Sequence, residues 1–275
     1  MKPVPFDYQR ARSVGEALAA LGDAAGDTKL IAGGQSLGPM LNLRLVRPAR
    51  LVDIGAIDAL NRIDQAGATV RVGACVTHAR LEDEAGAIDG LQPLAHAARG
   101  IAYRAIRNRG TLGGSLAHAD PAADWPLVMA AWGASFELAG PGGTRRVAAD
   151  AFMSGAYVTA LRDNELLAAA HLPRLSSQAR WAYRKFCRKP GEFAEAAAAV
   201  LFDPARRVAR VFVGAPAGRP TSLPMLARDI ARNGRASLRD DLLAQSCEAV
   251  LAGAPPARRQ ACHAMLRRAL EDVLS

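Results

Sequence analysis

The sequence predicts an α+β protein with two or three lobes. Short apolar runs that are typical of strands are interspersed with amphipathic stretches that have helical spacing. These strands and helices do not follow the strict β-α-β order of a parallel sheet with crossover helices. The character of the sequence also changes near Ala56 and again at the polar segment 174–180. These observations favour several α+β units over one doubly wound α/β sheet.

Up to residue 55 the sequence predicts two helices and two short strands. Ser13 is a suitable N-cap, and Glu16 completes a capping box three residues later. Gly22 is a typical stop for the helix that follows this cap. The other expected elements are strands at 29–32 and 51–54 and a helix from 37 to Pro48.

Between 56 and 174 the pattern predicts strands accompanied by helices. Strands are expected at 69–73, 135–138, 145–147 and 165–172. Helices are expected after the N-cap Thr77, over 91–106 with a break near Gly100, and from Asp120-Pro121 to Trp132. Asp120 would cap the last of these, because Asp suits the N-cap and Pro suits the first turn. The segment 109–115 is rich in glycine and predicts a turn.

The last hundred or so residues predict a smaller unit after a polar linker at 174–180. A second hairpin is expected from the apolar runs 196–202 and 208–213, which flank an Asp-Pro turn. Helices follow to the C-terminus, where Ala261, Met265, Ala269 and Val273 recur every four residues.

Composition excludes some classes of protein. Half of the 275 residues are hydrophobic, which is too many for a disordered chain. The net charge is +9, but the arginines are dispersed and aromatic residues make up only 5%. That is too few aromatics for the stacking platforms of single-strand nucleic-acid binders. An acidic partner protein or an anionic ligand fits the charge better than a nucleic acid.

Cysteine spacing and hydropathy indicate the environment of the chain. The four cysteines lie far apart, without the close spacing that zinc sites and iron–sulfur clusters need. We therefore expect no metal ligands in this chain. The start of the sequence does not resemble a secretory signal, and no uncharged apolar run is long enough to span a membrane. A cytoplasmic location without a membrane span is expected.

The most informative features are two glycine pairs, in AGGQS at 32–36 and TLGGS at 111–115. Glycine allows a positive φ and lets backbone N–H groups approach an anion closely. Such N–H groups ahead of a helix bind phosphate, and Ser36, Thr111 and Ser115 add hydroxyl donors. Two loops of this kind can clamp one pyrophosphate, although a Gly-Gly pair taken alone is more often a plain turn. The absence of a Walker motif and of GxGxxG disfavours P-loop hydrolysis and a Rossmann site.

Two long motifs surround these pairs, AGGQSLGPMLNLR at 32–44 and TLGGSLAHADPAADWP at 111–126. In order and separation they resemble the FAD-binding (medium) subunit of the molybdenum hydroxylases, the family of carbon monoxide dehydrogenase and xanthine dehydrogenase. The likeness continues through 51–54, through 165–173 and into YRKFCRKPGEFA at 183–194. It covers about residues 3–220 and weakens in the final helices.

The resemblance implies a two-lobed FAD-binding domain of the vanillyl-alcohol-oxidase/PCMH type, followed by a smaller C-terminal α+β domain. Lobe 1 would be 1–55, lobe 2 would be 56–174, and the C-terminal domain 175–275. The cofactor would be FAD, with its pyrophosphate on the two glycine loops. The residues that the resemblance places at the cofactor are Leu30, Ile31, Ala32, Gly33, Gly34, Gln35, Ser36, Leu37, Ile101, Thr111, Gly113, Gly114, Ser115, Asp124, Leu167 and Lys185.

Several of these polar residues have a simpler interpretation as well. Asp124 would either hydrogen-bond FAD or stabilise the start of its helix through the dipole. Lys185 would either stabilise an anionic reduced flavin or serve as an ordinary surface residue. His118 and Asp120 as metal ligands are disfavoured against a polar loop residue and a helix cap. His78 and His96 are interpreted as structural.

By resemblance, the chain is expected to be the flavoprotein subunit of an oxidoreductase. It would take electrons from the [2Fe-2S] clusters of a small partner subunit. These clusters would receive the electrons from a molybdopterin site on a large subunit, and the assembly would be a dimer of heterotrimers. The chain would pass the electrons to an external acceptor such as NAD⁺, a quinone or oxygen. No catalytic acid, base or nucleophile is expected in the chain itself. The alternatives are a stand-alone FAD-dependent oxidoreductase and a cofactor-free assembly protein of the same fold.

Overall fold

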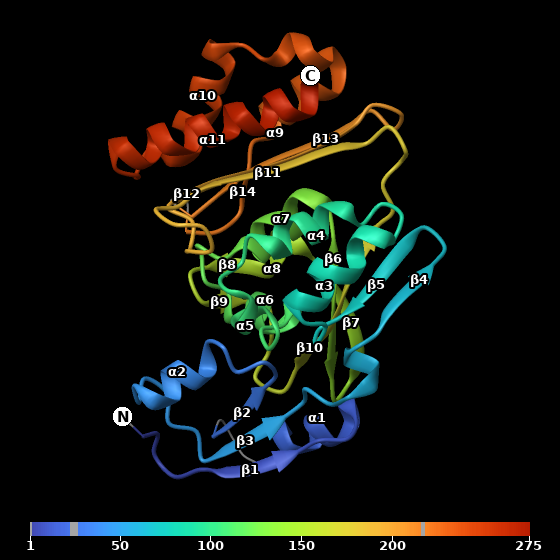
Figure 1. Ribbon diagram of the computed structural model, residues 1–275, viewed down its shortest axis with the longest axis vertical. Helices are drawn as coiled ribbons and strands as arrows, with labels where there is room; N and C mark the ends of the chain where they lie inside the picture. The colour runs from blue at the N-terminus through green and yellow to red at the C-terminus, as the bar shows by residue number, and fades with distance from the viewer. Residues whose placement is uncertain (1, 23–26, 216–217) are drawn as a thin grey trace.

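The computed structural model describes residues 2–22, 27–215 and 218–275. Three sheets follow one another along the chain, each with its own helices (Figure 1). A separate two-stranded hairpin pairs β8 (Met153–Gly155) with β9 (Val158–Thr159). Helices and sheets occur in an α+β arrangement, as the sequence predicts. Within the described residues, no helix has the length and apolar character needed to cross a membrane.

The first sheet is parallel, with strand order β1-β3-β2, and is blue in Figure 1. Its elements are β1 (Asp7–Arg10), α1 (Val14–Gly22), β2 (Thr28–Ile31), α2 (Leu37–Asn42) and β3 (Arg50–Asp53). The predicted Ser13 cap is confirmed, but the return bond of Glu16 goes to the residue before the cap. The Glu16 N–H donates to the Ser13 hydroxyl, and the Glu16 carboxylate accepts from the Arg12 N–H. Strand β1 was not predicted, because its side chains are all exposed and carry no apolar signal.

Helix α2 ends well before Pro48, so the predicted helix is too long. Arg44 adopts a left-handed conformation with φ of 58°. The N–H groups of Arg44 and Leu45 donate to the carbonyls of Leu41 and Met40, which closes the helix there. Glycine usually occupies such a position. The arginine therefore leaves no stop signal in the sequence.

The second sheet is antiparallel, with strand order β4-β5-β10-β6-β7. Its strands are β4 (Ile63–Ala66), β5 (Thr69–Gly73), β6 (Ser135–Gly140), β7 (Gly143–Ala148) and β10 (Leu166–Pro173). The helices around it are η1 (Asp58–Leu60), α3 (His78–Glu84), η2 (Ala85–Ala87), α4 (Gln92–Arg99), α5 (Arg104–Arg107), α6 (Leu112–His118), α7 (Asp124–Trp132) and α8 (Ala149–Phe152). The predicted β6–β7 hairpin and the Thr77 cap of α3 are confirmed.

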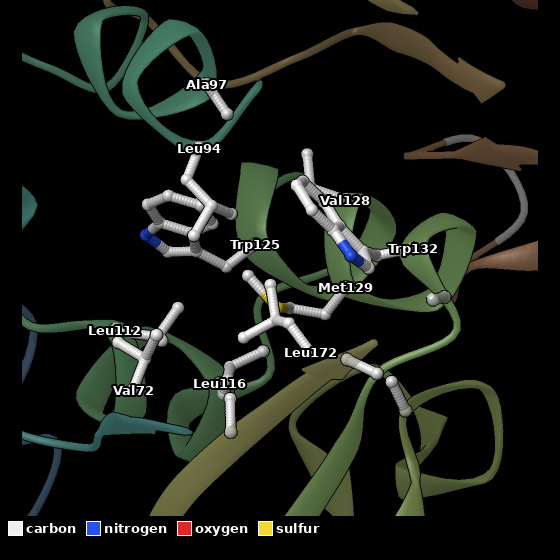
Figure 2. Close-up of a cluster of buried hydrophobic side chains, with 14 of the residues drawn as sticks. Val72, Leu94, Ala97, Leu112, Leu116, Trp125, Val128, Met129, Trp132 and Leu172 are labelled. Carbon is white, nitrogen blue, oxygen red and sulfur yellow. The ribbon is translucent and has the colours of Figure 1, made fainter. Parts of the chain in front are cut away.

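Helix α7 lies at the centre of the largest core, and all of its residues are buried. Figure 2 shows Trp125, Val128, Met129 and Trp132 of this helix packing between α4, α6 and strand β10. The helix begins at Asp124, three residues later than the predicted first residue Pro121. Asp120 accepts the Ala122 N–H in the turn before the helix, so it is not the N-cap. Proline is tolerated in the first turn, and Pro126 rather than Pro121 occupies that place.

The third sheet is antiparallel, with strand order β11-β12-β13-β14. Its strands are β11 (Arg180–Phe186), β12 (Ala196–Asp203), β13 (Val208–Gly214) and β14 (Thr221–Ser222), and its helices are α9 (Pro224–Asn233), η3 (Gly234–Ser237), α10 (Asp240–Leu251) and α11 (Pro256–Leu274). The alanine run of β12 serves two cores, because successive side chains of a strand point to opposite faces. Ala197 and Ala199 join the core around α7, while Ala196 and Ala198 join the core under the C-terminal helices. The β12–β13 hairpin is as predicted.

Candidate cofactor site

A cavity of about 1190 Å³ runs between the first sheet, helices α6 and α7, and the segment 188–195 that follows β11. Pockets for small molecules and cofactors usually measure about 300–1,000 Å³, so this one has room for a dinucleotide. The first sheet with its helices and the second sheet with its helices are held together by a shared hydrophobic core. The cavity wall therefore combines segments that are far apart in the sequence.

Nearly all the residues that the sequence singles out meet in this cavity. Its wall contains every residue from Leu30 to Leu37, together with Ile101, Thr111, Gly113, Gly114, Ser115, Asp124 and Leu167. Lys185 is the exception among the predicted residues, and its side chain points elsewhere. The structure thus brings the two glycine pairs to one site, with apolar side chains beside them.

The glycines at the centre of the site are required by contacts within the protein. A Cβ on Gly33 would lie 1.9 Å from the carbonyl oxygen of Arg109, so the first loop rests directly on the backbone of the second. A Cβ on Gly113 would lie 2.4 Å from that of Ala74. Gly34 has a φ of 69°, which favours glycine for a different reason. Close packing of the loops accounts for Gly33 and Gly113 without any ligand.

The two loops differ in the backbone donors that they leave available. Segment 109–115 was expected to be a turn, but its second half belongs to helix α6 (Leu112–His118), with Thr111 as N-cap. The first N–H groups of α6 are already taken, Leu112 by the Val76 carbonyl, Gly113 by the Ala74 carbonyl and Gly114 by the Thr111 hydroxyl. In contrast, the N–H groups of residues 33–36 have no acceptor within the described chain.

This asymmetry bears on what the cavity can bind. Four consecutive backbone donors at 33–36 line the cavity without a protein partner. Consecutive backbone N–H groups ahead of a helix form a concave site for negative charge, so such a run is suited to an anionic ligand. The Ser36 and Ser115 hydroxyls lie in the same wall. The residues present therefore fit a pyrophosphate, with loop 33–36 as the main donor and the helical segment as the facing wall.

Lys185 makes a buried ion pair with Asp124 on the inner side of the cavity wall. Its ammonium lies 2.8 Å from Asp124 Oδ1 and also donates to the carbonyls of Gly100 and Glu192. The Tyr183 hydroxyl donates to the same carboxylate oxygen at 2.8 Å. Burial raises the pKa of Asp124, against the opposing effects of Lys185 and Tyr183. The ammonium thus joins α7 to the loops at 100 and 192, and Lys185 is not an ordinary surface residue.

His118, Asp120 and Tyr157 form a polar cluster at another part of the wall. The Tyr157 hydroxyl donates to Asp120 Oδ2 at 3.2 Å, and the His118 ring packs on the Tyr157 ring. Tyr157 has a φ of 61°, unusual for a residue other than glycine. Among the described residues, no group of three or more His, Cys, Asp or Glu side chains is arranged to hold a metal ion.

His78 is a cavity residue that sequence reasoning interpreted only as structural. It begins α3 and is 5% exposed, and its Nδ1 accepts from the Trp125 indole N–H at 3.0 Å. Burial, with a smaller effect of Arg107, lowers the pKa of His78 to about 4. The imidazole is therefore neutral at pH 7. No local motif marks this position, because its partner Trp125 lies 47 residues further along the chain.

Comparison with known proteins agrees with this geometry. The family model described as the FAD binding domain in molybdopterin dehydrogenase matches residues 4–175. The chain is 43% identical to the carbon monoxide dehydrogenase medium chain of Hydrogenophaga pseudoflava over 73% of this chain and 70% of that one. It is 39% identical to caffeine dehydrogenase subunit beta of a Pseudomonas strain over 73% and 68% of the two chains.

Solved structures show the same relationship over the full length. The quinoline 2-oxidoreductase of Pseudomonas putida 86 superposes with a TM-score of 0.89 at 32% identity, covering 100% of this chain and 98% of the other. A Cu,Mo-CO dehydrogenase superposes with a TM-score of 0.91 at 33% identity, covering 99% of each chain. The chain therefore belongs to the family of FAD-binding domains of molybdopterin dehydrogenases, as an FAD-binding medium subunit of the molybdenum hydroxylase type, and is part of an oxidoreductase.

Proposed function

We propose that this chain carries electrons between the [2Fe-2S] clusters of a small partner subunit and an external acceptor. The molybdopterin site would lie on a third, large subunit, in a dimer of heterotrimers located in the cytoplasm. The observation that carries the proposal is the set of unpaired N–H groups at 33–36, which line a cavity of dinucleotide size. When bound, FAD supplies the redox chemistry that links one-electron clusters to a hydride or electron acceptor.

The residues of the chain would bind and orient the cofactor. Loop 33–36 and the hydroxyls of Ser36 and Ser115 would hold the pyrophosphate, because backbone donors suit an anion. Ile101 and Leu167 would supply apolar wall, which suits a flavin ring. Lys185 would act from behind the wall by holding the carbonyls of Gly100 and Glu192 in place. We retain 1–55, 56–174 and 175–275 as the proposed division into two lobes and a C-terminal domain.

The partner subunits follow from what the relatives are. Similar proteins are named as the medium chain or a subunit of two dehydrogenases and as the medium subunit of a hydroxylase. The described residues of this chain offer no metal-binding cluster of their own, so substrate oxidation at a metal would take place on another chain. The net charge of +9 suits association with an acidic partner surface.

Electron transfer can be tested in the complex, co-expressed with the chains encoded by neighbouring genes. The complex is reduced anaerobically with limiting dithionite and then mixed with NAD⁺, menadione or oxygen, while the iron–sulfur and flavin spectra are followed. At least one acceptor should reoxidise the clusters in the wild-type complex. The same clusters should stay reduced in a Gly33→Ala complex that lacks flavin, whereas a Gly38→Ala complex should behave as wild type.

Other outcomes of this experiment contradict the proposal in different ways. Equal cluster reoxidation with and without flavin would mean that electrons bypass this chain. A chain that turns over a substrate without partners would be a stand-alone oxidoreductase. A chain that takes up no FAD at all would be an assembly protein that keeps the fold.

A further inference from the structure

His78 presents an unused hydrogen-bonding group to the cavity. The residue is 5% exposed and lies in the cavity wall. One ring nitrogen, Nδ1, is occupied by Trp125. The other, Nε2, has no protein partner among the described residues, and protein atoms do not enclose it completely. It therefore remains accessible from the cavity side.

The Trp125 contact determines which nitrogen carries the proton. An indole N–H can only donate, so Nδ1 must accept with its lone pair. A neutral imidazole then has its hydrogen on Nε2. The Nδ1 to Nε1 distance is 3.0 Å, and both rings are buried. His78 is thus held as a donor, with its N–H on the edge of the ring opposite Trp125.

That donor edge lies where the two glycine loops meet. A Cβ on Gly110 would be 2.9 Å from His78 Nε2, so the ring edge packs directly against Gly110. The His78 backbone N–H donates to the Gly110 carbonyl at 2.9 Å, which fixes the same contact. On the first loop, a Cβ on Gly33 would be 2.9 Å from the Gly110 α-carbon. The His78 imidazole thus packs against Gly110, and Gly110 in turn packs against Gly33.

We propose that the Nε2–H of His78 donates a hydrogen bond to a phosphate oxygen of bound FAD, with Trp125 as the positioning residue that fixes the tautomer. The inference rests on the proposed placement of the pyrophosphate at the glycine loops. The α6 side has already used its first backbone donors within the protein. The His78 side chain, next to Gly110, would donate a hydrogen bond to phosphate on the α6 side of the site. The backbone N–H groups of loop 33–36 would donate on the opposite side.

Binding measurements on the full chain test the proposal with three probes, FAD, ADP and riboflavin. ADP carries the pyrophosphate without the flavin, and riboflavin carries the flavin without phosphate. A hydrogen bond to a charged group is worth roughly a ten- to hundred-fold change in affinity. His78→Phe should weaken FAD and ADP binding by about that factor and leave riboflavin binding unchanged. His78→Gln, which keeps an N–H donor near the Nε2 position, should recover most of the loss.

Controls separate this role from a structural one. His96→Phe, at an exposed histidine outside the cavity, should leave all three affinities unchanged. Nitrogen-15 NMR of wild type should show the Nε2–H tautomer, and Trp125→Phe should release it to a mixture. This spectrum tests the tautomer even if His78→Phe does not fold.

Three results would overturn the proposal: unchanged ADP affinity in His78→Phe, an equal loss for riboflavin, or an Nδ1–H tautomer in wild type. The proposed function fails separately. If wild type binds FAD and Gly33→Ala weakens it while His78→Phe does not, only the role of His78 falls. If wild type binds no FAD, the electron-transfer function falls with it.

Discussion

The α-carbon of Gly33 faces the carbonyl oxygen of Arg109 so closely that a Cβ there would lie 1.9 Å from that oxygen. Gly33 follows a strand of the first sheet, and Arg109 precedes helix α6 of the second unit. The contact joins the two halves of the cavity, so the shape of the site depends on both loops together.

Replacing Gly33 with Ala should separate the loops. The added methyl meets backbone, which cannot move aside as a flexible side chain could, and overpacking of this kind costs about 1–3 kcal/mol. We expect a lower free energy of unfolding and an FAD affinity reduced at least about tenfold, since 1.4 kcal/mol corresponds to that factor. Gly38→Ala is the matched control, because nothing lies within 4 Å of its Cβ. A Gly33→Ala chain with wild-type FAD affinity would contradict this account.

The Asp124–Lys185 pair should show strong coupling in a double-mutant cycle. Their side chains are only 5% and 11% exposed, so Lys185→Met leaves a buried carboxylate without its cation. Breaking such a pair costs about 3–5 kcal/mol, whereas replacing both partners with apolar residues restores part of the loss. Urea unfolding of Lys185→Met, Asp124→Leu and the double variant measures the coupling.

The neighbouring position on the same strand offers a control for that cycle. Arg184 pairs with Asp272 at 2.6 Å, but both side chains are more than a third exposed. Solvent screens such pairs, and Arg184→Met should cost no more than about 1 kcal/mol. Additive effects of the Asp124 and Lys185 substitutions would show that their pairing does not stabilise the fold.

Stability should depend on His78 in mildly acidic solution. The pKa of His78 is lowered to about 4 by burial and by Arg107, against an ordinary value of 6.5. Between these two pH values the unfolded chain binds the proton and the native chain does not, so stability falls as pH falls from 6.5 to 4. The full loss is roughly 3 kcal/mol, from about 1.4 kcal/mol per pKa unit.

Urea unfolding of wild type and His78→Gln at pH 7 and at pH 5 checks this dependence. Both chains lose stability through other groups, so the difference between them is the relevant quantity. Wild type should lose more stability than the variant over this interval. Equal losses would mean that His78 is as easily protonated in the native state as in the unfolded chain.

Elements that are determined by neighbouring residues could be predicted from the sequence. The Ser13 cap, the Thr77 cap and the two β-hairpins follow from neighbouring residues, and all are present. The segment 181–186 was not predicted as a strand, although it forms most of β11. The alternation of apolar and polar residues is weak there because Arg184 and Lys185 are adjacent. The segment is a strand because it pairs with β12 along its length.

The sequence predicts which residues line the candidate site, but it does not predict why two of the glycines are needed there. Both glycine pairs line one cavity, but Gly33 and Gly113 are needed for contacts with Arg109 and Ala74. The start of α7 and the environment of Lys185 depend on tertiary packing, which no local motif encodes. The role of His78 also depends on tertiary packing, because the atom that fixes its tautomer belongs to Trp125 on a distant helix.

The most direct test of the account is the visible spectrum of the purified full chain, with identification of the cofactor released on denaturation. If the two glycine loops hold FAD, the purified chain shows a flavin spectrum and releases about one FAD per chain. Both should be lost in Gly33→Ala and kept in Gly38→Ala. A colourless wild-type protein that also fails to take up added FAD would contradict FAD binding by these loops. The glycine loops would then serve only to pack the two halves of the molecule together.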